Sequence, residues 1–161
     1  MRTVLRTAIA AAIVLTAGPL DAAPFDPMRF FDGRTESEGQ VKIALRSPHG
    51  LRVHGRGHLE ADGTLVLDQT VEEEGEKPRQ RSWRMRQTAP GRYAGTISDA
   101  EGPVEADVTG GRFHLKFRMK GGLGVEQWLT PVGTDTLRNE MTIKKFGFTV
   151  ANVEETIRQV R

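Results

Sequence analysis

The stretch GRFHLKFRMKGG, residues 111–122, alternates apolar and polar side chains along its whole length. Its apolar positions are Phe113, Leu115, Phe117 and Met119, and its polar positions are Arg112, His114, Lys116, Arg118 and Lys120. A period of two places the two sets on opposite faces of a β-strand, and the glycines at both ends are typical of turns. The stretch therefore predicts a strand with one buried apolar face and one basic face toward solvent.

The same period recurs in most segments between residues 39 and 148, separated by turn signals such as ADG (61–63), APG (89–91), TGG (109–111) and GGLG (121–124). The turns fall every eight to twelve residues, which is the spacing of an antiparallel meander. About nine or ten short strands, each apolar on one face, would leave bare edges in an open sheet, and closure into a barrel removes them. We therefore predict an all-β fold, an antiparallel up-and-down barrel with a short N-terminal entry turn or helix at residues 24–33.

Residues 1–22 have the parts of a secretory signal peptide: Arg2 and Arg6, an apolar run from Ala8 to Ala17, and a cleavage point after Ala22. The apolar run is about half of the roughly 20 residues that a spanning helix needs. The chain has no cysteine for a disulfide or a lipid anchor. We expect a signal peptide at 1–22 and a single barrel domain at 23–161, secreted across the inner membrane into the periplasm as a soluble protein.

The formal net charge of +2 is too small for a nucleic-acid-binding protein, which needs many uncompensated cations. Acidic residues such as Glu105 and Asp107 lie on the segment before the basic stretch, so opposite charges are expected to face each other across neighbouring strands. The basic face is then mainly a neutralised outer wall. The alternative is a basic patch that contacts anionic lipid headgroups at a membrane surface or a polysaccharide.

No motif for catalysis, metal binding or cofactor binding is present in the sequence. There is no cysteine nucleophile and no Gly-x-Ser-x-Gly elbow. His54 and His58 share a strand face but are separated by about 13 Å at the rise of an extended chain, too far for one zinc ion. We therefore predict no catalytic residue, no metal and no cofactor, and we regard an enzyme as less favoured than a binding protein.

Two polar residues are expected on an inward face near the end of the chain. If Met141 and Ile143 point into the barrel, a period of two places Asn139 and Lys145 on the same face, at opposite ends of a run of about 20 Å. The two residues then bracket an elongated amphiphile. The alternative is a rim lysine that reaches water and an asparagine that hydrogen-bonds the backbone.

Several features of the chain form a recognisable pattern when they are taken together in order: FDPMRFFDGRTESEG (25–39), Trp83, GRYAGTISDAEG (91–102) and LRNEMTIKKFGF (137–148). This pattern resembles a bacterial lipocalin-like family of unknown function, whose members are exported, often as lipoproteins, and are often encoded near fatty-acid-modifying enzymes. The resemblance implies a lipocalin-like barrel, an envelope location and a final strand after residue 148. The periodicity of residues 149–160 taken alone slightly favours a helix, with Val150, Val153, Ile157 and Val160 on one side.

The chain also departs from the pattern of this family. It has no lipid-anchoring cysteine, and it has Gln69 where the resemblance leads us to expect a glutamate in the third strand. The segment LTPVGTDT (129–136) is short and lacks the expected paired aspartates and tryptophan. These departures remove a buried charge and put a family-wide site in doubt here.

Our leading hypothesis is a barrel that binds an apolar or amphiphilic small molecule such as a fatty acid or lipid. The alternatives are a packed structural or protein-interaction module of the envelope and, third, a barrel enzyme of the cyclase or isomerase type. A fatty-acid-sized ligand needs a pocket of about 300 Å³ or more, and an interior below about 100 Å³ favours the packed module. The candidate ligand-binding residues are Trp83, Met85, Tyr93, Phe113, Phe117, Asn139, Met141 and Lys145.

Overall fold

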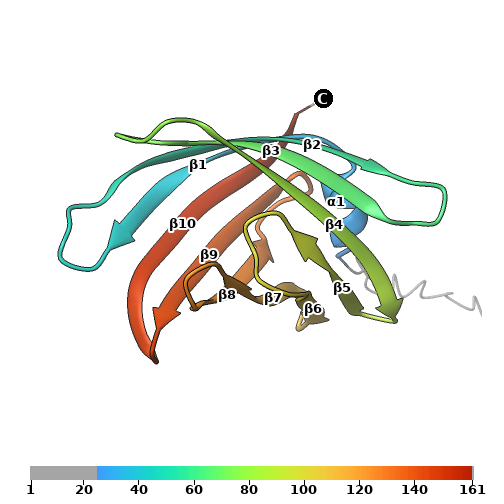
Figure 1. Ribbon diagram of the computed structural model, residues 1–161. Coiled ribbons are helices and arrows are strands. Elements are labelled where there is room, and N and C mark those ends of the chain that lie inside the picture. Colours follow the sequence, from blue (N-terminus) through green and yellow to red (C-terminus); the bar gives the residue numbers. More distant parts are fainter. Residues whose placement is uncertain (1–24, 161) are drawn as a thin grey trace, which may run out of the picture.

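The structure, a computed structural model, describes residues 25–160 and consists of one short helix and a closed barrel of antiparallel strands (Figure 1). The elements are α1 (Pro27–Phe31), β1 (Gly33–Ile43), β2 (His49–Leu59), β3 (Leu65–Glu73), β4 (Arg79–Ala89), β5 (Arg92–Ile97), β6 (Val104–Thr109), β7 (Arg112–Met119), β8 (Leu123–Pro131), β9 (Thr136–Lys145) and β10 (Phe148–Val160). Each strand pairs with its neighbours in sequence, and β1 pairs with β10 to close the ring. The predicted all-β up-and-down barrel is confirmed. The predicted signal peptide lies outside the described residues.

Strand β7, which contains the alternating stretch 112–119, has the predicted buried and exposed faces. In β7, Phe113, Leu115 and Phe117 are buried in the barrel core, and Lys116 and Arg118 are exposed on the outside. The buried set of the other strands follows the same parity, because neighbouring strands in register bring side chains of one face together. The core is therefore the inside of the tube.

Opposite charges face each other on the outer wall, as the sequence predicts. Lys116 is directly across from Glu105 in the register of β6 and β7. Arg52 Nε lies 3.4 Å from Glu38 Oε1, and Arg84 Nη2 lies 2.6 Å from Glu60 Oε2. Such exposed pairs contribute up to about 1 kcal/mol each. The charges on this wall are thus largely compensated.

Helix α1 closes one end of the barrel, against β1, β2 and β3 (Figure 1). It begins where it does because Asp26 Oδ1 accepts hydrogen bonds from the amides of Met28 and Arg29, and because Pro27 suits the first turn. Phe30 and Phe31 are buried, and each buried ring contributes about 1.5–3 kcal/mol. The entry segment predicted from the sequence is therefore a helical plug.

The last segment is strand β10, so the helical interpretation of its periodicity is wrong. The inward residues Ala151, Val153 and Ile157 alternate along the strand, but the inward Glu155 interrupts the apolar pattern and conceals the period of two. Both β1 and β9 would otherwise have an unpaired edge, and pairing with β10 satisfies both rows of backbone groups. Tertiary pairing thus decides the conformation of this segment.

The helix that the structure describes within residues 25–160 is neither long enough nor apolar enough to cross a membrane.

We expect the substitution Gly57→Ala to destabilise the barrel by unseating α1. A Cβ atom at Gly57 would overlap the backbone carbonyl oxygen of Phe31, so the helix or strand β2 must shift. The expected loss is roughly 1–3 kcal/mol in the free energy of unfolding, measured by chemical denaturation. The control is Gly124→Ala, where the nearest atom to the new Cβ is 3.9 Å away. Equal losses in the two variants would contradict this packing of α1.

Candidate functional site

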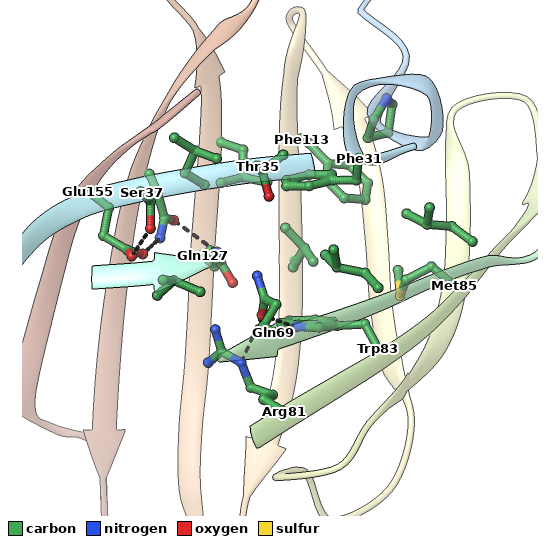
Figure 2. Close-up of a pocket in the computed structure, with 18 of the residues that line it drawn as sticks. Phe31, Thr35, Ser37, Gln69, Arg81, Trp83, Met85, Phe113, Gln127 and Glu155 are labelled. Atoms are coloured by element: carbon green, nitrogen blue, oxygen red, sulfur yellow. Dashed lines mark hydrogen bonds between the residues drawn. The ribbon is translucent and has the colours of Figure 1, made fainter. Parts of the chain in front are cut away.

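The interior of the barrel contains a small cavity of about 60 Å³ next to α1 (Figure 2). One part of its wall is apolar and includes Met28, Phe31, Trp83, Met85 and Phe113. The other part is polar, which is unusual for a barrel core of this size. The polar lining residues are Thr35, Ser37, Gln69, Arg81, Gln127, Asn139 and Glu155.

Four of these polar side chains form a hydrogen-bonded chain centred on the carboxylate of Glu155. Ser37 Oγ donates to Glu155 Oε1 over 2.8 Å, and Asn139 Nδ2 donates to Glu155 Oε2 over 2.6 Å. Gln127 Nε2 in turn donates to Asn139 Oδ1 over 2.9 Å. The residues come from the adjacent strands β1, β10, β9 and β8, and all four are buried. The cavity thus has one continuous polar wall.

The carboxylate sets the direction of this chain of hydrogen bonds. Both Glu155 oxygens accept, so Asn139 presents its amide nitrogen to Glu155 and its oxygen to Gln127. Gln127 must then present its nitrogen to Asn139. Its Oε1 atom is buried and has no hydrogen-bond partner among residues 25–160. A buried acceptor without a donor costs about 1–3 kcal/mol, and either a water molecule or a donor group of a ligand would satisfy it.

A second polar group lies on β3 and β4, at the part of the cavity away from α1 (Figure 2). Gln69 and Arg81 are cross-strand partners, and Arg81 Nε donates to Gln69 Oε1 over 3.0 Å. Trp83 Nε1 donates to the same oxygen over 2.8 Å. The neutral Gln69 stands where the family resemblance leads us to expect a glutamate, so it orients Arg81 without cancelling its charge.

The positive charge of Arg81 lacks a direct counter-ion. Among residues 25–160, no carboxylate forms an ion pair with Arg81, and its hydrogen bond to Gln69 uses Nε alone. Burial lowers the pKa of the Arg81 guanidinium, the charge of Arg79 lowers it further, and Glu155 and Asp99 raise it. The two terminal nitrogens are therefore available donors beside the cavity, with the fork geometry that suits a carboxylate or phosphate.

The structure separates the eight candidate residues from the sequence into three groups. Trp83, Met85, Phe113 and Asn139 line the cavity. Tyr93, Phe117 and Met141 are buried in the surrounding core, where the Tyr93 ring packs edge-on against Phe113 and the Phe117 ring against Trp83. Lys145 is exposed at the end of β9, with its Nζ atom 5.7 Å from the centre of the Phe146 ring. Asn139 and Lys145 therefore do not bracket the cavity.

Sequence reasoning missed most of the polar wall. The missed residues Ser37, Arg81, Gln127 and Glu155 each occupy an inward position by parity, between or beside apolar residues of the same face. A search for polar residues that interrupt an inward apolar series would have found them. The search for ligand-binding residues followed the apolar series itself and therefore returned mainly core residues.

The described residues also contain no group of three or more His, Cys, Asp or Glu side chains arranged to hold a metal ion.

A family of proteins of unknown function (DUF3833) matches residues 20–159, so the chain belongs to this family. No curated protein matches the sequence. Among solved structures, the S-type phycobiliprotein lyase from Guillardia theta superposes with a TM-score of 0.67 at 10% identity, covering 83% of this chain and 90% of that chain. A protein of unknown function from the DUF3598 family of Nostoc punctiforme superposes with a TM-score of 0.60 at 14% identity, covering 85% of this chain and 50% of that chain. At these identities the likeness establishes the barrel fold alone.

We expect the substitution Asn139→Leu to lower the free energy of unfolding by about 1–3 kcal/mol, because Glu155 and Gln127 each lose a buried hydrogen-bond partner. The control is Asn152→Leu on the outer face of β10, with an expected change within about 0.5 kcal/mol. Chemical denaturation measures both. The double variant Asn139→Leu/Glu155→Leu should lose less free energy of unfolding than the sum of the losses of its two single variants. The reason is that it also removes the Glu155 carboxylate, which Asn139→Leu alone leaves without one of its hydrogen-bond donors. Strict additivity would contradict the connected wall.

Proposed function

We propose that this member of the DUF3833 family binds an amphiphilic small molecule with an acidic group, such as a fatty acid, inside the barrel. The observation that carries the proposal is the guanidinium of Arg81 beside the cavity, whose terminal nitrogens have no carboxylate partner among residues 25–160. An apolar wall with Trp83, Met85 and Phe113 adjoins them. A few convergent polar groups in an apolar enclosure are the usual composition of a small-molecule site.

Stability alone does not account for these polar groups. Removing a charged group from water costs several kcal/mol unless it is paired, and an apolar side chain of similar volume is often more stabilising. Glu155 is buried and Arg81 is half-buried, yet each is held by neutral partners and they form no ion pair with each other. An interior selected only for packing gains nothing from this arrangement. An interior that binds a polar headgroup requires such spare donors and acceptors.

The volume of the cavity sets a condition on the proposal. A cavity of about 60 Å³ is far smaller than the roughly 300 Å³ of a typical ligand pocket, so a fatty acid requires a more open state. Helix α1 is the element that can provide the space, because Pro27, Met28 and Phe31 form part of the wall. It has five residues, and Gln159 Nε2 holds it by one hydrogen bond to the Phe30 carbonyl. The flexible side chains of Met28 and Met85 can also change rotamer and so enlarge the cavity.

The second candidate is a packed structural or interaction module of the cell envelope. The small cavity volume favours it, since the interior lies below the roughly 100 Å³ at which we expect a packed barrel. In this alternative the polar wall is a structural hydrogen-bond network, and Gln127 Oε1 is an acceptor that the network leaves unsatisfied. The two candidates differ in a measurable property, because the packed module has no affinity for fatty acids.

We further propose that the protein acts after export to the periplasm, on the support of the charge and apolar pattern of residues 1–22. Expression of the full chain in a bacterial host, followed by cell fractionation and intact-mass measurement, tests this location. The expected product is a periplasmic protein that begins at Ala23. An uncleaved product retained in the cytoplasm would contradict it.

Binding of a fluorescent long-chain fatty acid to the purified residues 23–161 tests the ligand. Arg81→Gln should weaken this binding at least tenfold, because one charge-assisted contact with the carboxylate contributes about 1.4 kcal/mol or more. The matched control is Arg86→Gln, which removes an exposed charge from the outer face of the same strand and should leave the affinity unchanged.

A fatty alcohol of the same chain length separates the role of the headgroup from that of the tail. The wild-type protein should bind the acid more tightly than the alcohol, and Arg81→Gln should abolish that preference. Mass spectrometry of lipids that copurify with the protein gives an independent measurement. If no lipid copurifies and neither probe binds, the packed module is the better description.

A further inference from the structure

Three large apolar side chains are exposed together at the end of the barrel opposite α1. Leu45 is in the turn between β1 and β2, while Phe146 and Phe148 are at the turn between β9 and β10, with exposed fractions of 105%, 88% and 77%. The two turns are neighbours because β1 pairs with β10, and the amide of Ala44 donates to the Val150 carbonyl over 2.9 Å. We call these three exposed side chains on two neighbouring turns the apolar tip.

Two of the three residues of the apolar tip have an unusual backbone conformation. Leu45 and Phe146 have φ values of 63° and 50°, and they are the non-glycine residues with positive φ in the part of the chain that the structure describes. A bulky side chain in this left-handed conformation costs about 1 kcal/mol or more, and short hairpin turns normally use Asn-Gly instead of Phe-Gly. The strained positions thus coincide with the most exposed apolar side chains. Such a coincidence is typical of a binding surface.

Three turns around the apolar tip carry positive charge, and the acidic turn with Asp99 and Glu101 borders one of them through backbone hydrogen bonds to Lys120 and Arg118. Three adjacent turns, with the strand ends beside them, span residues 42–48, 118–124 and 142–150, and contain no Asp or Glu. Their cations are Lys42, Arg46, Arg118, Lys120, Lys144 and Lys145. Lys42 is tied to its turn by a hydrogen bond from Nζ to the Arg46 carbonyl, which leaves its charge intact. This group contrasts with the compensated outer wall.

The other two turns at the same end are acidic. The turn between β3 and β4 contains Glu74, Glu76 and Lys77, and the turn between β5 and β6 contains Asp99 and Glu101. Of these, Asp99 pairs with Arg79, and Glu74 accepts a hydrogen bond from the amide of Gly50. The end of the barrel is therefore divided into a basic side with the apolar tip and an acidic side. A flat negative surface would contact the basic side first.

We propose that the apolar tip and its surrounding cations dock the barrel on the surface of an anionic lipid bilayer. Phe146, Phe148 and Leu45 would enter the interfacial region, where aromatic and aliphatic side chains are favoured, and the lysines and arginines would lie at the headgroups. Each such cation contributes about 1 kcal/mol to binding at an anionic membrane. The cations together therefore contribute more binding free energy than the burial of a single apolar side chain. This docking is independent of the ligand proposed for the cavity.

The charges favour a membrane over a second copy of this chain. Two copies that met through this surface would place like charges together, which opposes association. The apolar side chains also project from turn tips instead of forming a flat patch that could pack closely against another protein surface. An anionic bilayer satisfies both features, since it is negative and deformable.

Cosedimentation of purified residues 23–161 with lipid vesicles tests the docking. The protein should bind vesicles of phosphatidylcholine with about 30% phosphatidylglycerol at least tenfold more tightly than pure phosphatidylcholine vesicles, and 0.5 M salt should weaken the binding. The variant Phe146→Ser/Phe148→Ser should lose at least tenfold in affinity for the anionic vesicles. Lys144→Gln/Lys145→Gln should lose a similar factor, together with part of the salt dependence.

The controls remove an apolar side chain or two positive charges from parts of the surface away from the apolar tip. Val132→Ser alters an exposed apolar residue in the turn between β8 and β9, and Arg29→Gln/Arg34→Gln removes two exposed cations at the α1 end. Both controls should bind like the wild type, and circular dichroism should show every variant folded. Equal binding of all folded variants, or the absence of binding to anionic vesicles, would overturn the proposal. A dimer that Phe146→Ser/Phe148→Ser dissociates, without vesicle binding, would show that the tip contacts a second copy instead.

Discussion

The pairing of β10 with β1 is the interaction on which the rest of the structure depends. Each strand of the meander pairs with its sequence neighbour, but the barrel becomes closed only when the last strand meets the first. Closure removes both sheet edges and converts one apolar face into an enclosed core. It also builds the polar wall, because Ser37 on β1 can donate to Glu155 on β10 only across this seam. Barrel stability and cavity chemistry thus share one contact.

The interior combines two charges of opposite sign that are kept apart by amides. Gln69 accepts from Arg81, and Asn139 donates to Glu155, so each charge has a neutral partner in place of the other charge. A direct ion pair would saturate both groups, whereas amide partners leave the terminal nitrogens of Arg81 unused. The arrangement retains directional donors and acceptors at a cost in desolvation. This cost is the physical basis for regarding the cavity as more than packing.

The sequence predicted the fold well because its alternation of side chains is local. Each residue of β7 takes its face from its immediate neighbours, and the barrel follows from repeating that rule. The failures have physical causes of the same kind. Glu155 broke the apolar alternation of β10, so its periodicity alone favoured a helix; the family resemblance correctly implied the strand, and the pairing with β1 and β9 explains it physically. For Lys145, parity gives the face of a strand but not the height along the barrel, and β9 carries this residue beyond the core to the exposed end. The pairing of distant strands and the position of a residue along the barrel axis cannot be read from a few neighbouring residues of the sequence.

The two ends of the barrel differ in a way that gives the interior a direction. The α1 end is apolar and closed, with Met28 and Phe31 on the cavity, whereas Arg81 lies on the far side of the cavity, near the start of β4 at the end with the apolar tip (Figure 2). A carboxylate held by Arg81 would therefore direct its apolar chain toward α1. The additional volume must then open at α1, where the wall consists of a five-residue helix and flexible methionine, and not at the strands, whose ladders fix their spacing. The same asymmetry would place the headgroup of the ligand nearest the end that carries the exposed aromatic residues and the lysines.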